Sequence, residues 1–154
     1  MRELARMNLH EIPFARLLAL EPCEEEACIL ALPDAPQYLN HLGTVAAAAQ
    51  FSLAEFTSGQ WLLNTYPEWA DRVVPVLRRS EVRFRRPAHG KVRASVPFEA
   101  HAVPNLQTEL ETRGRALISI PVLLHDASLQ LVMEGSYEWF LAIKSIDNSS
   151  ELRG

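Results

Sequence analysis

The chain has 154 residues and a mass of 17.3 kDa, with 48% apolar and 22% charged residues. This length and composition fit one globular domain with a buried core, and they exclude a disordered tail, a collagen-like repeat and a coiled coil. The formal net charge of −4 disfavours general binding to nucleic acid, which depends on cationic side chains. No apolar stretch approaches the roughly 20 residues of a membrane-spanning helix. The first residues include Glu3 and lack the apolar run of a signal peptide, so we expect a cytoplasmic protein.

The first part of the chain predicts short elements. Residues 2–8 favour a short helix. The apolar run at 17–20, ended by Pro22, predicts a first strand, and residues 27–32 predict a second.

Cys23 and Cys28 flank three consecutive glutamates in this region. Structural zinc sites use four ligands, and the five histidines show no paired spacing that would complete such a site. We therefore expect no metal. Because a cytoplasmic compartment is reducing, the sequence predicts two packed, reduced cysteines.

Residues 44–63 predict a long helix that is apolar on nearly every side. The segment contains four consecutive alanines at 46–49, followed by phenylalanine, leucine and tryptophan residues, and its helix propensity is high. Thr44 is a candidate N-cap, and the helix should end before Pro67 because a residue that precedes proline avoids helical angles. A helix without a polar face must be surrounded by protein.

From about Val73 the apolar period changes from 3.6 to 2, which predicts strands. Residues 79–85 and 91–98 alternate apolar and polar side chains, with a turn at 87–90 between them. This pattern predicts a hairpin with one wet, basic face.

The last part predicts a short helix at 104–113 and a final pair of strands at 115–124 and 129–143. No repeat or linker divides the chain, so we expect a single domain over 1–146 and a C-terminal tail at 147–154. An antiparallel sheet wrapped around one apolar helix accounts for these elements, which is an α+β architecture.

Glu55 is the one permanently charged side chain between Asp34 and Glu68. Burying an unpaired carboxylate costs several kcal/mol, so Glu55 must face water, pair with a cation or raise its pKa. One interpretation is a structural acid that pairs with an arginine of the strands. The other is a general base or nucleophile in an apolar pocket.

The segment from Asn40 to Glu55, NHLGTVAAAAQFSLAE, resembles the central segment of hotdog-fold acyl-CoA thioesterases of the phenylacetate-degradation and 4-hydroxybenzoyl-CoA kind. Their pattern is roughly N-x-x-G-T-x-H-G-G-x-x-x-x-L-A-D/E. RFRRPAHG at 83–90 and GRALIS at 114–119 extend the resemblance, which covers about residues 12–144. It implies the hotdog fold and hydrolysis of an acyl-CoA-type thioester. The chain looks closest to hotdog proteins of unassigned function.

The resemblance implies roles by position. Glu55 falls at the catalytic acid, which attacks the thioester carbonyl or activates water. Asn40 falls where an amide orients substrate or water. Ala47 falls where a backbone N–H polarises the thioester oxygen, a role that suits the free N–H groups of a helix N-terminus. No cofactor is implied. The family joins subunits through sheet edges, which implies a homodimer or homotetramer with sites at the subunit interface.

Four positions depart from the family pattern. Ala46 replaces its histidine, Ala47 and Ala48 replace its glycines, and Leu77 stands where the next strand often has Ser or Thr. Alanine keeps the N–H but adds a methyl group in the path of the thioester. A non-catalytic acyl- or CoA-binding protein is therefore the first alternative. A hotdog dehydratase or hydratase is the second, and it would need a histidine beside the acid, for which His41 is the only nearby residue.

Eight of the 15 cationic residues lie between Arg72 and Arg93, where Glu81 is the only acid. One interpretation is a solvated strand face that discourages edge pairing. The other is a surface for the phosphates of coenzyme A, which arginine suits by bidentate donation. The candidates for that surface are Arg83, Arg85, Arg86 and Lys91. We expect no nucleic acid here, because exposed aromatic residues do not alternate with these cations.

Overall fold

The computed structural model describes residues 11–97 and 105–145. Its elements are α1 (Pro13–Leu17), β1 (Glu21–Pro22), β2 (Cys28–Leu32), the 3-10 helix η2 (Pro36–Tyr38), α2 (Ala47–Thr65), β3 (Val73–Phe84), β4 (Val92–Ser95), α3 (Leu106–Arg113), β5 (Arg115–His125) and β6 (Leu131–Ile143). The helix expected at 2–8 and the tail expected at 147–154 lie outside the described residues. No helix in the described ranges has the length and hydropathy to cross a membrane.

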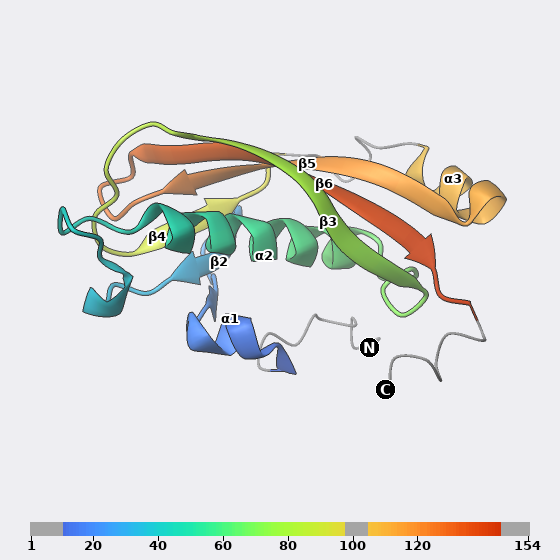
Figure 1. Ribbon diagram of the computed structural model, residues 1–154, viewed down its shortest axis with the longest axis horizontal. Coiled ribbons are helices and arrows are strands. Elements are labelled where there is room, and N and C mark those ends of the chain that lie inside the picture. The colour runs from blue at the N-terminus through green and yellow to red at the C-terminus, as the bar shows by residue number, and fades with distance from the viewer. Residues whose placement is uncertain (1–10, 98–104, 146–154) are drawn as a thin grey trace.

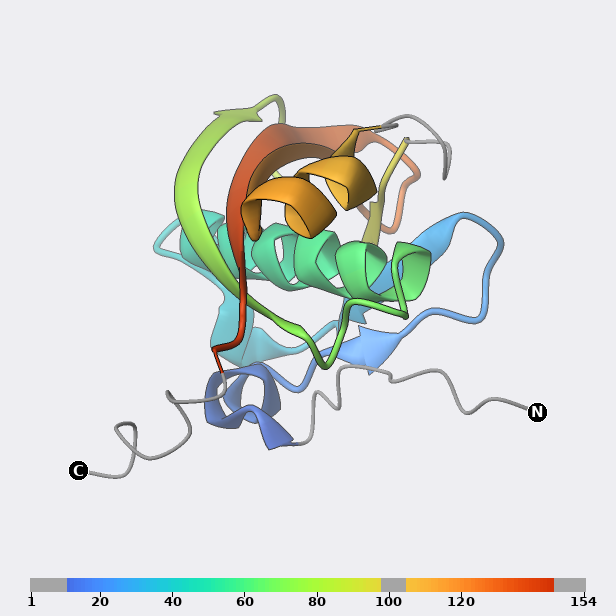
Figure 2. The ribbon, with the colours of Figure 1, turned by 90° about the vertical axis from the view of Figure 1, so that its right-hand side faces the viewer.

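The strands form one six-stranded antiparallel sheet in the order β1-β2-β4-β5-β6-β3. Figures 1 and 2 show the sheet curving around α2, which occupies the centre of the fold, while α1 lies on the side away from β5 and β6. The predicted α+β class and hotdog architecture are therefore confirmed. The two edges of this sheet are the short β1 and the long β3.

α2 is the buried centre of the fold, as its composition predicts. Leu53, Ala54, Thr57 and Ser58 are 0% exposed. The Thr57 hydroxyl donates to the Leu53 carbonyl (2.7 Å), and the Ser58 hydroxyl donates to the carbonyl of Glu55 (2.7 Å). Because these hydroxyls bond to the helix's own backbone, they are buried without leaving a polar group unpaired.

The start of α2 differs from the prediction. Its N-cap is Ala46, with a φ of −58° and a ψ of 141°, and not Thr44. Thr44 instead exchanges hydrogen bonds with the side chain of Asn40, and the Ala46 N–H donates to the carbonyl of Tyr38 (2.8 Å). Consequently no side chain caps the helix. The end of α2 at Thr65 agrees with the prediction.

Two predicted strand arrangements differ from the structure. The first strand is confined to Glu21–Pro22, and residues 17–20 form none of it, because Pro13 opens the helix α1 and Ala19 turns the chain at a φ of +52°. The hairpin expected between residues 79–85 and 91–98 does not form either. β3 pairs with β6, whereas β4 lies between β2 and β5. Alternating side chains predict a strand, but packing with distant segments decides its partner. The final pair, β5 and β6, is confirmed.

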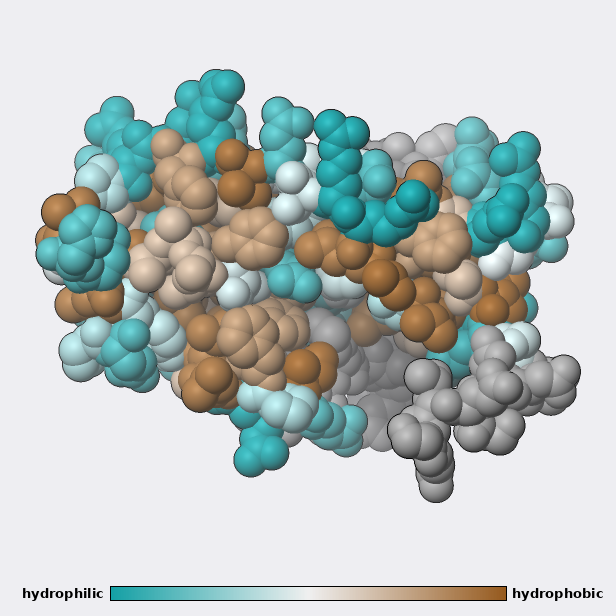
Figure 3. Space-filling model, viewed as in Figure 1, coloured by the Kyte–Doolittle hydropathy of each residue, from teal (hydrophilic) through white to brown (hydrophobic). Residues whose placement is uncertain are grey.

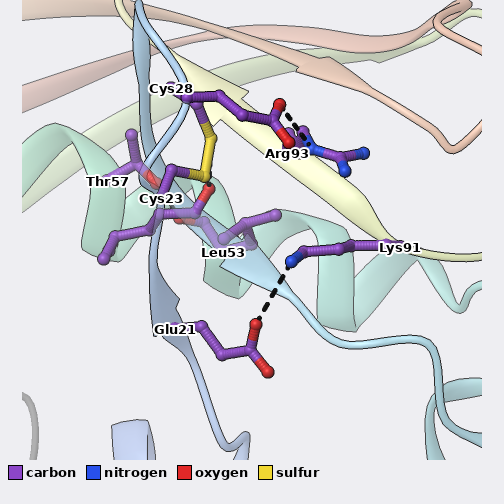
Figure 4. The surroundings of a disulfide bond; sticks show 9 residues. Glu21, Cys23, Cys28, Leu53, Thr57, Lys91 and Arg93 are labelled. Atoms are coloured by element: carbon purple, nitrogen blue, oxygen red, sulfur yellow. Dashed lines mark hydrogen bonds and ion pairs between the residues drawn. A yellow bond between two sulfur atoms is a disulfide. The ribbon is translucent and has the colours of Figure 1, made fainter.

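Cys23 and Cys28 are joined in a disulfide, so the expectation of reduced thiols is wrong. The β1–β2 hairpin brings their Cα atoms to 5.4 Å, within the range that a disulfide bridges. Figure 4 shows this disulfide beside the ion pair between Lys91 and Glu21 (3.3 Å), which ties the hairpin to the start of β4. Within the described ranges, no group of three or more His, Cys, Asp or Glu side chains has the arrangement of a metal site.

Candidate functional site

Glu55 lies near the middle of α2 and is half-buried. Burial raises the pKa of its carboxyl above the ordinary value. Within residues 11–97 and 105–145, no lysine, arginine or histidine forms a salt bridge with it. The interpretation of Glu55 as half of a structural ion pair therefore gains no support from the described residues.

The N-terminus of α2 is open to solvent at Ala47 and Ala48. Neither backbone N–H meets an acceptor in the described part of the chain, since the Ala46 N–H bonds to Tyr38 and the Gln50 N–H begins the helical ladder at Ala46. These free N–H groups and the positive end of the helix dipole favour an oxygen that carries negative charge. Ala47, at which the resemblance implies a backbone N–H for the thioester oxygen, is the first residue of α2 and is exposed.

Asn40 organises the loop that leads into α2. Its Oδ1 accepts hydrogen bonds from the backbone N–H of Leu42 (2.9 Å) and of Thr44 (3.2 Å), and its Nδ2 donates to the Thr44 hydroxyl (3.1 Å). The amide nitrogen carries two hydrogens, so one N–H remains for another partner. The structure thus gives Asn40 a role in shaping the loop and does not place it against Glu55.

The basic residues divide into paired and unpaired side chains. Arg85 forms an ion pair with Glu134 of β6, and Lys91 pairs with Glu21. Arg83 and Arg86 are exposed and form no salt bridge with any described residue.

The loop that follows these arginines contacts the start of α2. The Val45 N–H donates to the carbonyl of Ala88 (2.9 Å). The structure therefore brings the loop at 85–91 and the N-terminus of α2 together, although they are about 40 residues apart in sequence.

Two residues that sequence reasoning missed are bonded to the turns of α2 on either side of Glu55. Tyr137 and Trp139 of β6 reach α2 with hydrogen bonds at Phe51 and Ser58. Leu77 of β3 pairs in register with Trp139. The only signal in the sequence was the strand alternation of 129–143, which places both aromatic residues on one face but does not show that this face meets Glu55.

An apolar crevice lies at the other end of α2. It is small, with a cavity volume of about 10 Å³, and lies between α2, α3 and the start of β3. Leu62, Leu63 and Tyr66 contribute the α2 wall. Leu62 and Tyr66 lie 7 and 11 residues after Glu55, so they share its side of the helix.

The face that α2 presents between β3 and α1 carries many apolar side chains. Figure 3 shows them as a brown and tan band across the middle of the molecule, with hydrophilic side chains above. Phe14 and Leu17 of α1 and Val74 and Val76 of β3 are 49%, 76%, 45% and 51% exposed. Exposed apolar side chains gathered on one face are typical of interaction surfaces.

Comparison with known proteins identifies the relatives of the chain. Residues 15–141 match the family described as domain of unknown function DUF4442. No curated protein matches the chain significantly.

Solved structures share the fold. A Pseudomonas aeruginosa protein of unknown function, named a probable thioesterase, is 31% identical and covers 92% of this chain and 95% of its own, with a TM-score of 0.76. A Chlorobaculum tepidum protein of unknown function is 16% identical over 88% of this chain and 89% of its own (TM-score 0.73). A Bacillus halodurans protein solved with CoA is 17% identical over 83% of this chain and 74% of its own (TM-score 0.59). The chain therefore belongs to the DUF4442 family, a thioesterase-like hotdog family of unassigned function.

Proposed function

We propose that this protein hydrolyses an acyl-CoA-type thioester, with Glu55 as the general base or nucleophile. The observation that carries the proposal is the half-buried Glu55 carboxyl, which has no cationic partner among the described residues and whose pKa is raised by burial. A raised pKa suits a group that takes a proton during turnover and returns it. The thioesterase-like family and the CoA in the Bacillus halodurans relative support the choice of substrate.

The chemistry follows from these groups. Acting as a base, the Glu55 carboxylate takes a proton from water while the water oxygen attacks the thioester carbonyl carbon. The carbonyl oxygen becomes negative and is stabilised by the Ala47 N–H at the helix N-terminus. When the C–S bond breaks, the proton on Glu55 passes to the leaving sulfur. The products are the acid and the free thiol of CoA, and Glu55 is again ionised.

One protomer does not complete this site. Ala47 and Glu55 are eight residues apart on α2, which places their Cα atoms about 12 Å apart at 1.5 Å per residue. A single thioester carbonyl group is too small to contact both. We propose that a second copy of the chain lies against the apolar face of α2, with sheets joined at the long β3 edge, so that Ala47 of one protomer meets Glu55 of the other. The protein is then a homodimer, or a tetramer built from such dimers.

The unpaired arginines complete the substrate surface. Arg83 and Arg86 are free to bind the phosphates of CoA, whereas Arg85 and Lys91 would first have to leave Glu134 and Glu21. Asn40 acts by holding the loop before α2, with its remaining N–H available to the substrate or to water. We infer that all of these groups belong to a single domain over residues 1–146.

A non-catalytic acyl- or CoA-binding protein is the second candidate. It is favoured by the exposed methyl groups of Ala47 and Ala48 at the helix N-terminus. Methyl groups at this place hinder the approach of a bulky thioester to the N–H groups.

A turnover screen separates the two candidates. Short, long and aromatic acyl-CoAs are incubated with the protein, and the free thiol is measured. Glu55→Gln should lower hydrolysis by about 10² or more while CoA-ester binding is retained. Glu24→Gln, which alters an exposed acid in the β1–β2 turn, is the matched control and should keep full activity. Wild-type turnover by Glu55→Gln would exclude Glu55 as the catalytic group, and tight binding without any turnover would establish the binding protein.

A further inference from the structure

Two side chains of β6 fasten the α2 turn that carries Glu55. The Tyr137 hydroxyl donates to the carbonyl of Phe51 (3.1 Å), and the indole N–H of Trp139 donates to the Ser58 hydroxyl (2.8 Å). Tyr137 and Trp139 are two residues apart on one strand, so both point to the same face of the sheet. Each bond joins segments that are more than 80 residues apart in the chain.

These bonds bracket the backbone of Glu55. In an α-helix the N–H of Glu55 donates to the carbonyl of Phe51, which is also the acceptor of the Tyr137 hydroxyl. On the other side, the carbonyl of Glu55 accepts the Ser58 hydroxyl (2.7 Å), and Ser58 in turn accepts the Trp139 indole. Both backbone polar groups of Glu55 are therefore linked to β6 through one intermediate.

Tyr137 is the more tightly enclosed of the two donors. It is 0% exposed, and its ring packs on Phe51 with centroids 5.3 Å apart. Burial, together with the nearby negative charge of Glu55, raises the pKa of Tyr137. The phenol therefore stays protonated and remains a donor at any pH near neutrality.

We propose that Tyr137 is a positioning residue for Glu55, which fixes the rotation and depth of the α2 turn against the sheet through the Phe51 carbonyl. This inference rests on the proposed role of Glu55 in thioester hydrolysis. Ser58 and Trp139 form the second attachment of the same turn. A displacement of about 1 Å at a catalytic group can reduce turnover by about 10², so a missing hydrogen bond at this place should be visible in kcat.

Tyr137→Phe tests the proposal, because it removes the hydroxyl and keeps the ring. We expect a roughly tenfold lower kcat with KM within about twofold, since the substrate surface is unchanged. Tyr38→Phe is the matched control. Tyr38 is also a buried tyrosine, 5% exposed, whose hydroxyl donates to a backbone carbonyl, that of Leu18. Tyr38→Phe should keep the wild-type kcat, and equal losses of kcat in the two variants would make the effect structural and overturn the proposal.

Two further measurements show whether Tyr137 acts through Glu55. In a double-mutant cycle, Tyr137→Phe should lower kcat in the wild-type background but not in Glu55→Gln. Titration of the Glu55 carboxyl by carbon NMR should show its raised pKa moved toward the ordinary value in Tyr137→Phe, because a loosened turn leaves the carboxyl less buried, and unchanged in Tyr38→Phe. An unshifted Glu55 titration in Tyr137→Phe, or equal losses of kcat in both backgrounds, would overturn the proposal.

The outcomes also separate this inference from the proposed function. If Glu55→Gln hydrolyses at the wild-type rate, the proposed role of Glu55 fails and the positioning role fails with it. If Glu55→Gln is inactive while Tyr137→Phe retains full kcat, only the positioning role fails. Ser58→Ala loosens the same turn from its other end and should also lower kcat. It tests the attachment of the turn if Tyr137→Phe does not fold.

Discussion

A site shared between two protomers predicts complementation between two inactive variants. Glu55→Gln removes the acid and keeps the Ala47 N–H. Ala47→Pro removes that N–H and keeps the acid. Neither homodimer contains an intact site. In a mixed dimer, Ala47 from the first variant meets Glu55 from the second, which restores one of the two sites.

Ala47→Pro is compatible with the fold. Residue 47 is the first position of α2, where proline is favoured because its missing N–H has no helical acceptor. Ala46 has a φ of −58° and a ψ of 141°, close to the polyproline II conformation that a residue before proline can adopt. The side chain at 47 is exposed. We therefore expect the melting temperature to stay close to that of the wild type, so that lost activity reports the N–H and not unfolding.

The magnitude of the rescue follows from dimer statistics. Random exchange of equal amounts gives half mixed dimers, each with one intact site of two, so activity should recover to about a quarter of the wild-type value. The assay is free-thiol release before and after subunit exchange. Ala47→Ser keeps the N–H with a side chain of similar size and should remain active alone. A mixture that stays inactive, although mixed dimers are detected by native mass spectrometry, would refute a site built across the interface.

Three further predictions concern stability and charge. Burial raises the folded-state pKa of Glu55 above its ordinary value of 4.5. The free energy of unfolding of the wild type should therefore fall as pH rises from the unfolded-state pKa to the folded-state pKa of Glu55. At pH 7 the free energy of unfolding of Glu55→Gln should exceed that of the wild type by about 1 kcal/mol, and near pH 4 the two should be equal. The difference is small because half of the carboxyl stays in water. A Glu55→Gln variant that is less stable than the wild type at pH 7 would contradict this prediction. Arg86→Glu should weaken CoA-ester binding, measured by calorimetry, and make that binding less dependent on salt. Arg113→Glu, on the exposed surface of α3, is the control and should change neither quantity. Equal effects of the two substitutions would mean that Arg86 does not bind the phosphates of CoA. Cys28→Ser should lower the free energy of unfolding by about 2 kcal/mol, the chain-entropy value for so short a loop. A reductant should lower the melting temperature of the wild type and leave that of Cys28→Ser unchanged. A wild-type melting temperature that does not respond to reductant would mean that the disulfide contributes nothing.

The sequence predicted the central helix because its signal is local. A long run without polar faces has to be enclosed whatever its partners are, and α2 ends before Tyr66 and Pro67 for reasons of backbone geometry alone. The final strand pair was equally local, because β5 and β6 are joined by a short turn. The partners of β3 and β4 were not predictable in this way. Both segments alternate correctly, but their neighbours are chosen by contacts across the whole sheet.

The candidate site was predictable where a single residue is anomalous. Glu55 stands out because no other permanent charge occurs near it in the sequence, and its burial agrees with that anomaly. The assignment of Thr44 as N-cap was wrong because Asn40 competes for its hydroxyl. The cysteine expectation was wrong because it relied on compartment, whereas the hairpin geometry brings the two residues together.

The attachment of α2 to β6 shows why a site needs more than its reactive residue. The sequence places a carboxylate on an apolar helix, but the position of that carboxylate depends on how the helix is rotated against the sheet. Apolar packing alone constrains rotation weakly, because neighbouring helix faces of similar size can pack in more than one way. Directional hydrogen bonds from Tyr137 and Trp139 select one rotation. These donors lie more than 80 residues from the acid they hold, so the chain must fold before its site has a defined geometry.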